Sequence, residues 1–236
     1  MTSLLRTLAR GASIIGLVAV SSAAWAQPAA PPDRARNTTL PAVIPIFPLE
    51  DATLFPSASH PYHIFEPRYR AMVADALKGD HLIGMVTLKP GYEADYEGRP
   101  PIFPIGCAGL VTDVEELPDG RFNLILQGVV KFRVTSEEKG RPYRLAHVET
   151  LPETLGTEEA AALGSERRRL EALVTRPGST IPADISDEEV VNTLAQYVPL
   201  DPPEHQALLE LKDALVRSQA LIRLIETAGA PSQREH

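Results

Sequence analysis

The pattern of hydrophobic and polar residues changes near residue 155. Between residues 41 and 155, short apolar runs separated by Gly and Pro are typical of a β-rich region. Four of its strands are expected at residues 43–47, 62–65, 82–88 and 143–151. Pro45 and Pro48 interrupt the first of them, and because Pro cannot donate to a β-ladder, we expect this strand at a sheet edge.

A hairpin is the clearest motif in the β-rich region. Its two arms, residues 105–117 and 121–135, flank the turn Pro118-Asp119-Gly120. In this turn Gly120 can adopt the positive φ that other residues resist. Gly128 lies inside the second arm and predicts a bulge at which that strand bends.

A helix is predicted after Pro67, which suits a first helical turn because its missing N–H removes no hydrogen bond there. The apolar spacing changes at this point from two to between three and four residues. Gly79 is placed to end the helix. The residues expected on its buried face are Tyr69, Met72, Val73, Ala76 and Leu77.

Residues 156–228 are predicted to form a helical subdomain. The expected helices run from residue 158 to 174, from the capping box of Ser186 and Glu189 to about 198, and from the capping box of Asp201 and Glu204 to about 228. The remaining segments, 27–40 and 229–236, are expected to be a flexible leader rich in Pro and Ala and a disordered tail.

The first 26 residues have the three-part layout of a secretory signal peptide. Their apolar run, residues 14–20, is shorter than the roughly 20 residues that span a bilayer, which disfavours the alternative of an uncleaved membrane anchor. Ala24 and Ala26 form the small-x-small site, so cleavage is expected before Gln27. We therefore expect a periplasmic or secreted bacterial protein without a transmembrane span after cleavage.

The chain is acidic. Its formal net charge is −8, and it becomes −10 when residues 1–26 are removed with their two arginines. Binding to phosphate backbones relies on clustered Lys and Arg, whereas the basic run Arg167-Arg168-Arg169 lies in a predicted helix between acidic residues. We therefore expect no nucleic-acid partner, and an acidic surface favours basic or weakly charged polypeptides.

Candidate catalytic and metal-binding residues are few. Cys107 is the single cysteine, so no intramolecular disulfide forms, and its apolar neighbours predict a buried, inert thiol. His60, His63 and Glu66 lack the H-E-x-x-H spacing that places two imidazoles on one helix face. No G-x-x-x-x-G-K-[ST] loop that cradles ATP phosphates is present. We expect no catalytic residue, metal or cofactor.

Several motifs occur in the same order as in a known domain. Residues 63–69 follow Pro45-Ile46-Phe47-Pro48-Leu49 and Leu54-Phe55-Pro56, and they precede strand signatures at 106–111, 123–128 and 132–134. From about residue 41 to 226, the chain closely resembles the N-terminal substrate-binding domain of ATP-dependent Lon proteases. The resemblance implies an α+β fold, with a PUA-like bent β pseudo-barrel at 41–155 followed by a C-terminal helical bundle.

The resemblance also implies a function. In Lon proteases this domain contacts polypeptide substrates, whereas the ATPase and the Ser and Lys protease pair of that family have no counterpart here. We expect a non-enzyme that binds extended or unfolded polypeptide in the envelope, as a holdase or as an adaptor for a separate protease. The expected contact residues are Phe55, Ile64, Phe65, Glu66, Arg68, Tyr69, Tyr92 and, with them, Phe103.

Three other interpretations stay open. Glu66 and Arg68 can have a structural role instead, because they lie at a helix start where they could tie strand to helix. The protein could be a hydrolase with an unrecognised site, for which Cys107, His63 and Glu66 are the first candidates. It could also be a small-ligand sensor that uses a groove between the β-rich and helical regions.

Overall fold

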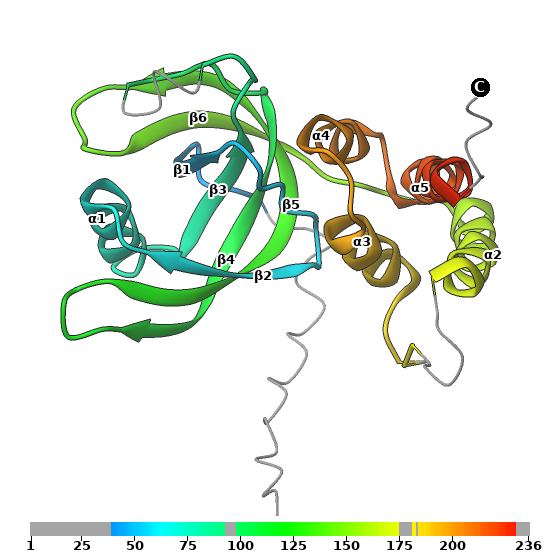
Figure 1. The fold of residues 1–236 in the computed structure, drawn as a ribbon. Coiled ribbons are helices and arrows are strands. Elements are labelled where there is room, and N and C mark those ends of the chain that lie inside the picture. The colour runs from blue at the N-terminus through cyan, green and yellow to red at the C-terminus, as the bar shows by residue number, and fades with distance from the viewer. Residues whose placement is uncertain (1–38, 93–97, 175–180, 183, 230–236) are drawn as a thin grey trace, which may run out of the picture. The chain divides into compact units, whose positions relative to one another are not determined.

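The computed structural model describes residues 39–92, 98–174, 181–182 and 184–229 (Figure 1). The predicted signal peptide, most of the leader, the C-terminal tail and the middle of the 90–104 loop lie outside these residues, so their predictions remain predictions. The described residues all belong to one compact unit.

The strands all precede helices α2 to α5, and α1 lies among the strands in the sequence. The described elements are β1 Val43–Leu49, β2 Ser59–Ile64, α1 Pro67–Ala76, β3 Leu82–Thr87, β4 Ile105–Glu116, β5 Phe122–Glu138, β6 Arg144–Leu151, α2 Thr157–Val174, α3 Asp187–Tyr197, α4 Pro202–Glu210 and α5 Ala214–Gly229.

The strands form a sheet that closes into a ring. Their order is β2-β5-β4-β3-β1-β6, and β6 pairs again with β5. The long strand β5 makes closure possible, because its first part pairs with β2 and its later part, from Lys131 onward, pairs with β6. The ring contains both parallel and antiparallel pairs. The predicted α+β class and bent pseudo-barrel are confirmed.

The predicted hairpin is formed by β4 and β5. Gly120 has φ +78° in the connecting turn, as expected for a position that favours glycine. The register shifts where Ala108 pairs with Val130 and Gly109 with Gly128, which leaves Val129 as an extra residue. The bulge predicted at Gly128 is therefore confirmed, and β5 changes partner from β2 to β6 around it.

The edge position predicted for β1 is wrong. This strand pairs in parallel with β3 through Ile46–Leu49 and antiparallel with β6 through Val43–Ile46. Pro45 therefore lies where only β6 is paired, and Pro48 lies where only β3 is paired. Each proline has one unpaired side toward which its nitrogen can face, so an interior strand tolerates both.

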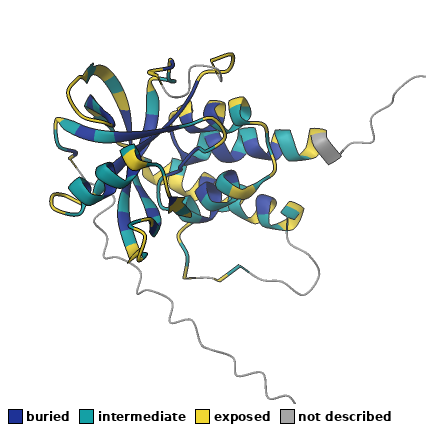
Figure 2. Cartoon of the chain, turned by 60° about the vertical axis from the view of Figure 1, so that its left-hand side comes forward, coloured by how far each residue is buried: buried dark blue, intermediate teal, exposed yellow. Residues whose placement is uncertain are grey.

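Two hydrophobic clusters fill the molecule, and Figure 2 shows the buried residues along the strands and inner helix faces. The smaller cluster is made of side chains from the ring of strands, including Ile44, Ile46, Val86 and Phe132. The larger cluster includes residues of β2 to β5, of α1 and of α2 to α5, among them Met85, Met72 and Leu163. One continuous core thus joins the sheet to the helices.

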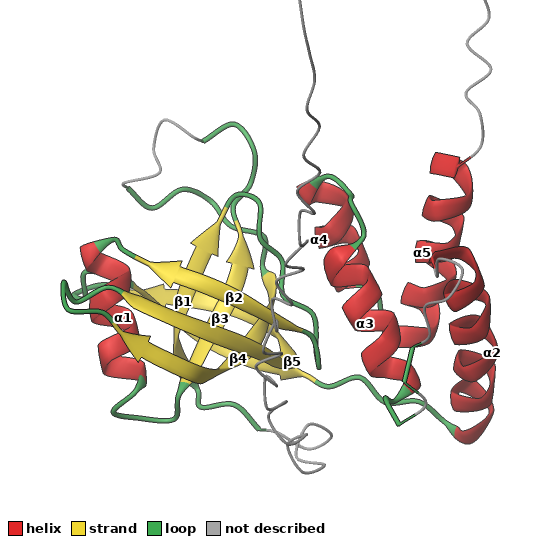
Figure 3. Ribbon diagram, turned by 60° about the horizontal axis from the view of Figure 1, so that its bottom comes forward, coloured by secondary structure: helices red, strands yellow, loops and turns green. Residues whose placement is uncertain are grey.

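Helix α1 begins at Pro67, as predicted, and buries Tyr69, Met72, Val73 and Ala76. Figures 1 and 3 show it at the side of the sheet that faces away from α2 to α5. Its N-terminal residues follow β2 directly, so the predicted 63–69 segment forms the corner between strand and helix.

The two predicted capping signals are confirmed at the starts of α3 and α4. Ser186 Oγ accepts from Glu189 N at 3.2 Å, and Glu204 Oε2 accepts from Asp201 N at 3.0 Å. The uninterrupted helix predicted after Asp201 is wrong, because α4 ends at Glu210 and α5 begins at Ala214.

Side chains satisfy the backbone groups that this break exposes. Asp213 Oδ1 accepts from Val216 N at 3.0 Å and acts as a cap for α5. Arg217 Nε donates to the carbonyl of Leu208 at 3.0 Å, and Lys131 Nζ donates to the carbonyl of Leu211. The break therefore depends partly on a lysine of β5, which the local sequence could not reveal.

Candidate functional site

The 63–69 segment supplies both core and surface side chains. Ile64 and Tyr69 are 3% and 4% exposed, and the Tyr69 ring lies 4.5 Å from the Phe47 ring in β1, measured between centroids. Phe65 is 60% exposed. The segment therefore anchors α1 to the sheet and leaves one aromatic ring in solvent.

Glu66 and Arg68 form an ion pair at the start of α1. Arg68 Nε donates to Glu66 Oε2 at 2.9 Å, and the guanidinium carbon lies 4.6 Å from the centre of the Tyr69 ring, within cation–π distance. Glu66 occupies the N-cap position, but its side chain makes no capping hydrogen bond. These contacts support the structural interpretation, and Arg68 in addition lines a cavity.

Phe55 belongs to the core. Its side chain is fully buried, its backbone N donates to Gln196 Oε1 at 3.1 Å, and the Arg217 guanidinium lies 5.5 Å from its ring centre. Phe55 and Ile64 thus have no free surface to offer a client, whereas Tyr69, although 4% exposed, lines a cavity together with Arg68. Of the predicted contact residues, Phe65 and Tyr92 are the two with strongly exposed rings.

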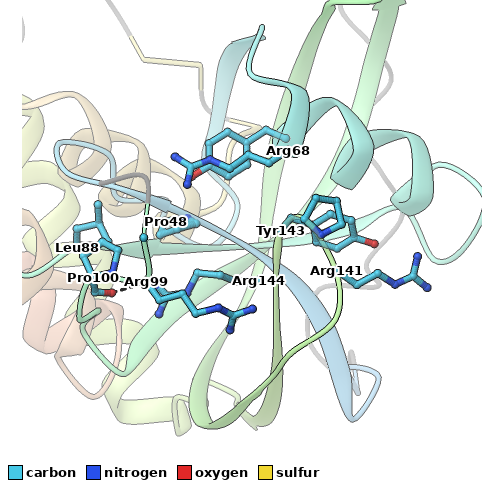
Figure 4. A pocket seen from close by; sticks show the side chains of 11 residues that line it. Pro48, Arg68, Leu88, Arg99, Pro100, Arg141, Tyr143 and Arg144 are labelled. Carbon is cyan, nitrogen blue, oxygen red and sulfur yellow. Dashed lines mark hydrogen bonds between the residues drawn. The ribbon is translucent and has the colours of Figure 1, made fainter. Parts of the chain in front are cut away.

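A cavity of about 270 Å³ opens between α1, the loop before β4 and the start of β6. Among the described residues, the charged side chains in its lining are arginines: Arg68, Arg99, Arg141 and Arg144. Figure 4 shows three of them around the hollow, whereas Arg141 points away from the others. This lining gives an acidic protein a locally basic pocket.

The carboxylates that pair with these arginines lie outside the lining. Glu137 Oε2 accepts from Arg144 Nε at 2.8 Å and lies 3.4 Å from Arg99 Nη1, so one carboxylate serves two guanidiniums. Arg144 also donates from Nη1 to the carbonyl of Pro100 at 2.8 Å. Within the described residues, this wall of the cavity carries more positive than negative charge.

Asp75 of α1 binds two residues that line the cavity, Tyr143 and Arg141. Its Oδ2 accepts from the Tyr143 hydroxyl at 2.8 Å and from Arg141 Nη1 at 2.9 Å. The hydrogen bond from Tyr143 is the largest cause that holds the pKa of Asp75 below its ordinary value, with Lys78 and Arg141 adding to it. The ionised Asp75 ties the β5–β6 turn to α1.

A second hollow of about 250 Å³ adjoins the first, because Leu88 and Pro100 line both. Its lining is largely apolar and aromatic and includes Tyr92, Phe103, Pro202 and Pro203. The two prolines belong to the start of α4, so this hollow lies between the β-rich and helical regions. The small-ligand interpretation expected a groove at this junction.

Arg99, Arg141 and Arg144 were not among the residues predicted for a site. Arg99 and Arg141 both occur in the tripeptide Gly-Arg-Pro, at residues 98–100 and 140–142. This repeated tripeptide, which combines turn-forming residues with a cation, was the signal that the sequence offered. That both turns lie at one cavity could be seen only in the folded structure.

The residues of the hydrolase interpretation do not form a catalytic pair. Cys107 is fully buried, as predicted, and burial raises the pKa of its thiol to about 12. Cys107 lies opposite Lys131 of β5, whereas His63 lies opposite Asn123 of the same strand. His63 Nδ1 is 2.7 Å from Asn123 Oδ1, and its Nε2 is 3.1 Å from Arg121 Nη1. These contacts make His63 part of an exposed polar network.

The described part of the chain offers neither a metal-binding cluster nor a helix suited to cross a membrane. It contains no group of three or more His, Cys, Asp or Glu side chains arranged to hold a metal ion. None of its helices combines the length and the apolar character needed to cross a bilayer.

Strand β2 is the edge of the described sheet, where an extended peptide could in principle add a strand. Pro61 lies in the middle of β2 and has no N–H to donate. The carbonyl of Ser59 already accepts from the Tyr197 hydroxyl at 2.5 Å. Both features limit strand addition at this edge, so the two hollows are the better candidates for a binding site.

Comparison with known proteins identifies the family. The family described as "ATP-dependent protease La (LON) substrate-binding domain" matches residues 43–227. Lon protease 2 of Myxococcus xanthus is 27% identical over 216 residues, which covers 86% of this chain and 26% of that protein. The Lon protease of Dictyoglomus thermophilum is 29% identical over 201 residues, which covers 79% and 25%. The chain spans about a quarter of the length of these relatives.

Solved structures show the same fold. The Lon N-terminal domain protein from Xanthomonas campestris gives a TM-score of 0.55 at 22% identity and covers 77% of this chain and 97% of that one. The N-terminal domain of the Mycobacterium avium complex Lon protease gives 0.62 at 18% identity and covers 78% and 98%. The predicted resemblance is confirmed, and the chain belongs to the family of Lon substrate-binding domains.

Proposed function

We propose that this protein binds extended or unfolded polypeptide without catalysing a reaction on it. The observation that carries the proposal is the pair of adjoining hollows, one basic and one aromatic, in a chain of the Lon substrate-binding family. Extended polypeptide presents side chains and backbone together, and a groove with apolar and polar parts suits both.

The pair of hollows is a better candidate for the client-binding site than the edge of the sheet at β2. Tyr92 is 47% exposed and lines the aromatic hollow, so its ring offers apolar surface that a client would cover. Strand addition at β2 is limited by Pro61 and by the Tyr197 contact. A non-catalytic role is supported by the buried, weakly acidic thiol of Cys107.

The place of action is the bacterial envelope in this proposal, after removal of residues 1–26. There the protein acts as a holdase or as an adaptor that delivers clients to a separate protease. The signal-peptide pattern supports export.

The proposal is tested with the mature protein, which begins at Gln27. We expect it to raise the fluorescence anisotropy of a labelled, chemically unfolded protein and not that of the same protein when folded. Tyr92→Ser should weaken binding about tenfold, since burial of an aromatic side chain contributes roughly 1.5–3 kcal/mol. Leu173→Ser on α2, where the side chain is 41% exposed, should leave binding unchanged.

Holdase and adaptor roles separate in a second measurement. A holdase slows the aggregation of the unfolded protein by itself, whereas an adaptor increases its degradation when an envelope protease is added. If the mature protein binds no unfolded chain at any ionic strength tested, the proposed function is incorrect.

A further inference from the structure

The two hollows adjoin at Leu88 and Pro100, which line both; together they are called the groove, and its two ends differ chemically. One end is lined by four arginines and, within the described residues, by no carboxylate. The other end is mainly apolar and is lined by Tyr92 and Phe103, with Glu50 and Lys89 as its charged residues. A ligand that fills both ends needs an anionic group and an apolar group at a fixed separation.

The arginine end is suited to a carboxylate. The side chains of Arg68 and Arg144 are 19% and 9% exposed, so their interactions are screened less than those of surface charges. A guanidinium fork matches a carboxylate in geometry and can bind it through two parallel hydrogen bonds. The four arginines pair with three carboxylates outside the lining, those of Glu66, Asp75 and Glu137, so one positive charge remains for a further carboxylate.

The acidic charge of the whole protein restricts which polypeptides can use this end. With a formal net charge of −8, the chain repels strongly acidic polypeptides at long range. A single carboxylate within an apolar segment avoids most of this repulsion and still gains the local attraction of the arginines. The groove therefore favours weakly charged clients, as expected from the composition of the chain. Such a client would carry one acidic residue, which lies at the arginine end.

We propose that the groove selects extended segments in which an Asp or Glu side chain is followed or preceded, two residues away, by an aromatic or large aliphatic side chain. In an extended chain, side chains at positions i and i+2 point to the same face, about 6.6 Å apart. Neighbouring residues point to opposite faces and cannot enter adjoining hollows together. This inference rests on the proposed function and specifies the client.

The test uses short labelled peptides with blocked termini and the mature protein. A peptide with Glu and Phe two residues apart should bind about tenfold more tightly than the same peptide with Gln in place of Glu, because hydrogen bonds to charged groups are stronger than neutral ones. Placing Glu and Phe side by side should remove the preference. The Arg99→Gln variant should bind the Glu and Gln peptides with nearly equal affinity.

Arg121→Gln is the matched control. Arg121 is comparably exposed and ion-paired, with Asp119, but it lies at the β4–β5 turn outside both hollows. This variant should keep the full preference for Glu. A loss of preference equal to that of Arg99→Gln would show a general charge effect and overturn the inference.

The remaining outcomes separate this inference from the proposed function. Equal binding of the Glu and Gln peptides would overturn the carboxylate selection while polypeptide binding stands. If neither peptide nor any unfolded protein binds, the proposed function itself fails. If a Gln peptide with a free C-terminal carboxylate binds as tightly as the Glu peptide, the arginines recognise the C-terminus of a chain. Displacement of the Glu peptide by an equal concentration of inorganic phosphate would assign them to phosphate, and either result overturns the inference.

Discussion

Replacing Arg217 with Met should lower the free energy of unfolding by about 3–5 kcal/mol, because it breaks a buried ion pair and leaves buried hydrogen-bond acceptors without their donor. Arg217 of α5 is fully buried. Its guanidinium donates from Nη1 to Glu153 Oε2 at 3.1 Å and to Asn192 Oδ1 of α3 at 2.6 Å. The variant would leave both oxygens without this donor.

The cluster around Arg217 joins the β-rich and helical regions. Lys131 of β5 lies 2.8 Å from Glu153 Oε1 and also binds the carbonyl at the break between α4 and α5. Burial lowers the pKa of Lys131, and the charge of Glu153 opposes this shift. Loss of Arg217 therefore affects the sheet, the connection to α2 and the last two helices at once.

Urea unfolding measures the change, with Arg223→Met as the control. Arg223 lies in the same helix but is exposed, so its replacement should change stability by less than about 0.5 kcal/mol. The double variant Arg217→Met/Glu153→Gln should be no more stable than Arg217→Met, because it also removes the carboxylate that pairs with the buried Lys131. Equal stability of Arg217→Met and Arg223→Met would refute this account of the cluster.

Gly128→Ala should destabilise the protein by about 1–3 kcal/mol or more, as overpacking of a well-packed site does. A Cβ atom at residue 128 would lie 2.0 Å from the carbonyl oxygen of Phe55, which belongs to the backbone and cannot rotate away. The backbone of Gly128 also donates to the carbonyl of Ala58 and accepts from Ser57 N, each at 2.8 Å. The extra methyl group would separate the bulge of β5 from the 55–58 turn.

Gly79→Ala provides the control for this second prediction. The nearest atom to a Cβ at residue 79 is the carbonyl oxygen of Ala76 at 3.8 Å, which is ordinary van der Waals distance. Thermal unfolding should show a clear fall in Tm for Gly128→Ala and little change for Gly79→Ala. A Gly128→Ala protein with unchanged Tm would mean that the close approach to Phe55 relaxes without cost.

The local features of the fold could be predicted because short-range chemistry determines them. The Pro118-Asp119-Gly120 turn, the bulge at Gly128 and the cap at Ser186 each depend on residues a few positions apart. The 63–69 segment identified the family for the same reason, since it is a compact corner in which Ile64 and Tyr69 anchor α1.

Features that depend on distant residues could not be predicted. The interior position of β1 follows from its pairing with β6, which is about a hundred residues away in the chain. The break between α4 and α5 involves Lys131 of β5 and has no Gly or Pro to mark it. Likewise, Arg99 and Arg144 meet only because the ring of strands closes, and the exposure of Phe65 beside buried Ile64 required the three-dimensional packing.

Site-specific photocrosslinking tests most directly whether clients bind in the groove. A photoreactive phenylalanine analogue is placed at Tyr92 in the aromatic hollow, at Phe65 on the α1 corner or at Leu173 on α2, all of which are exposed. With an unfolded protein present, the account predicts covalent adducts from position 92 and few from positions 65 and 173. Adducts mainly from position 65 or 173, with none from 92, would contradict it.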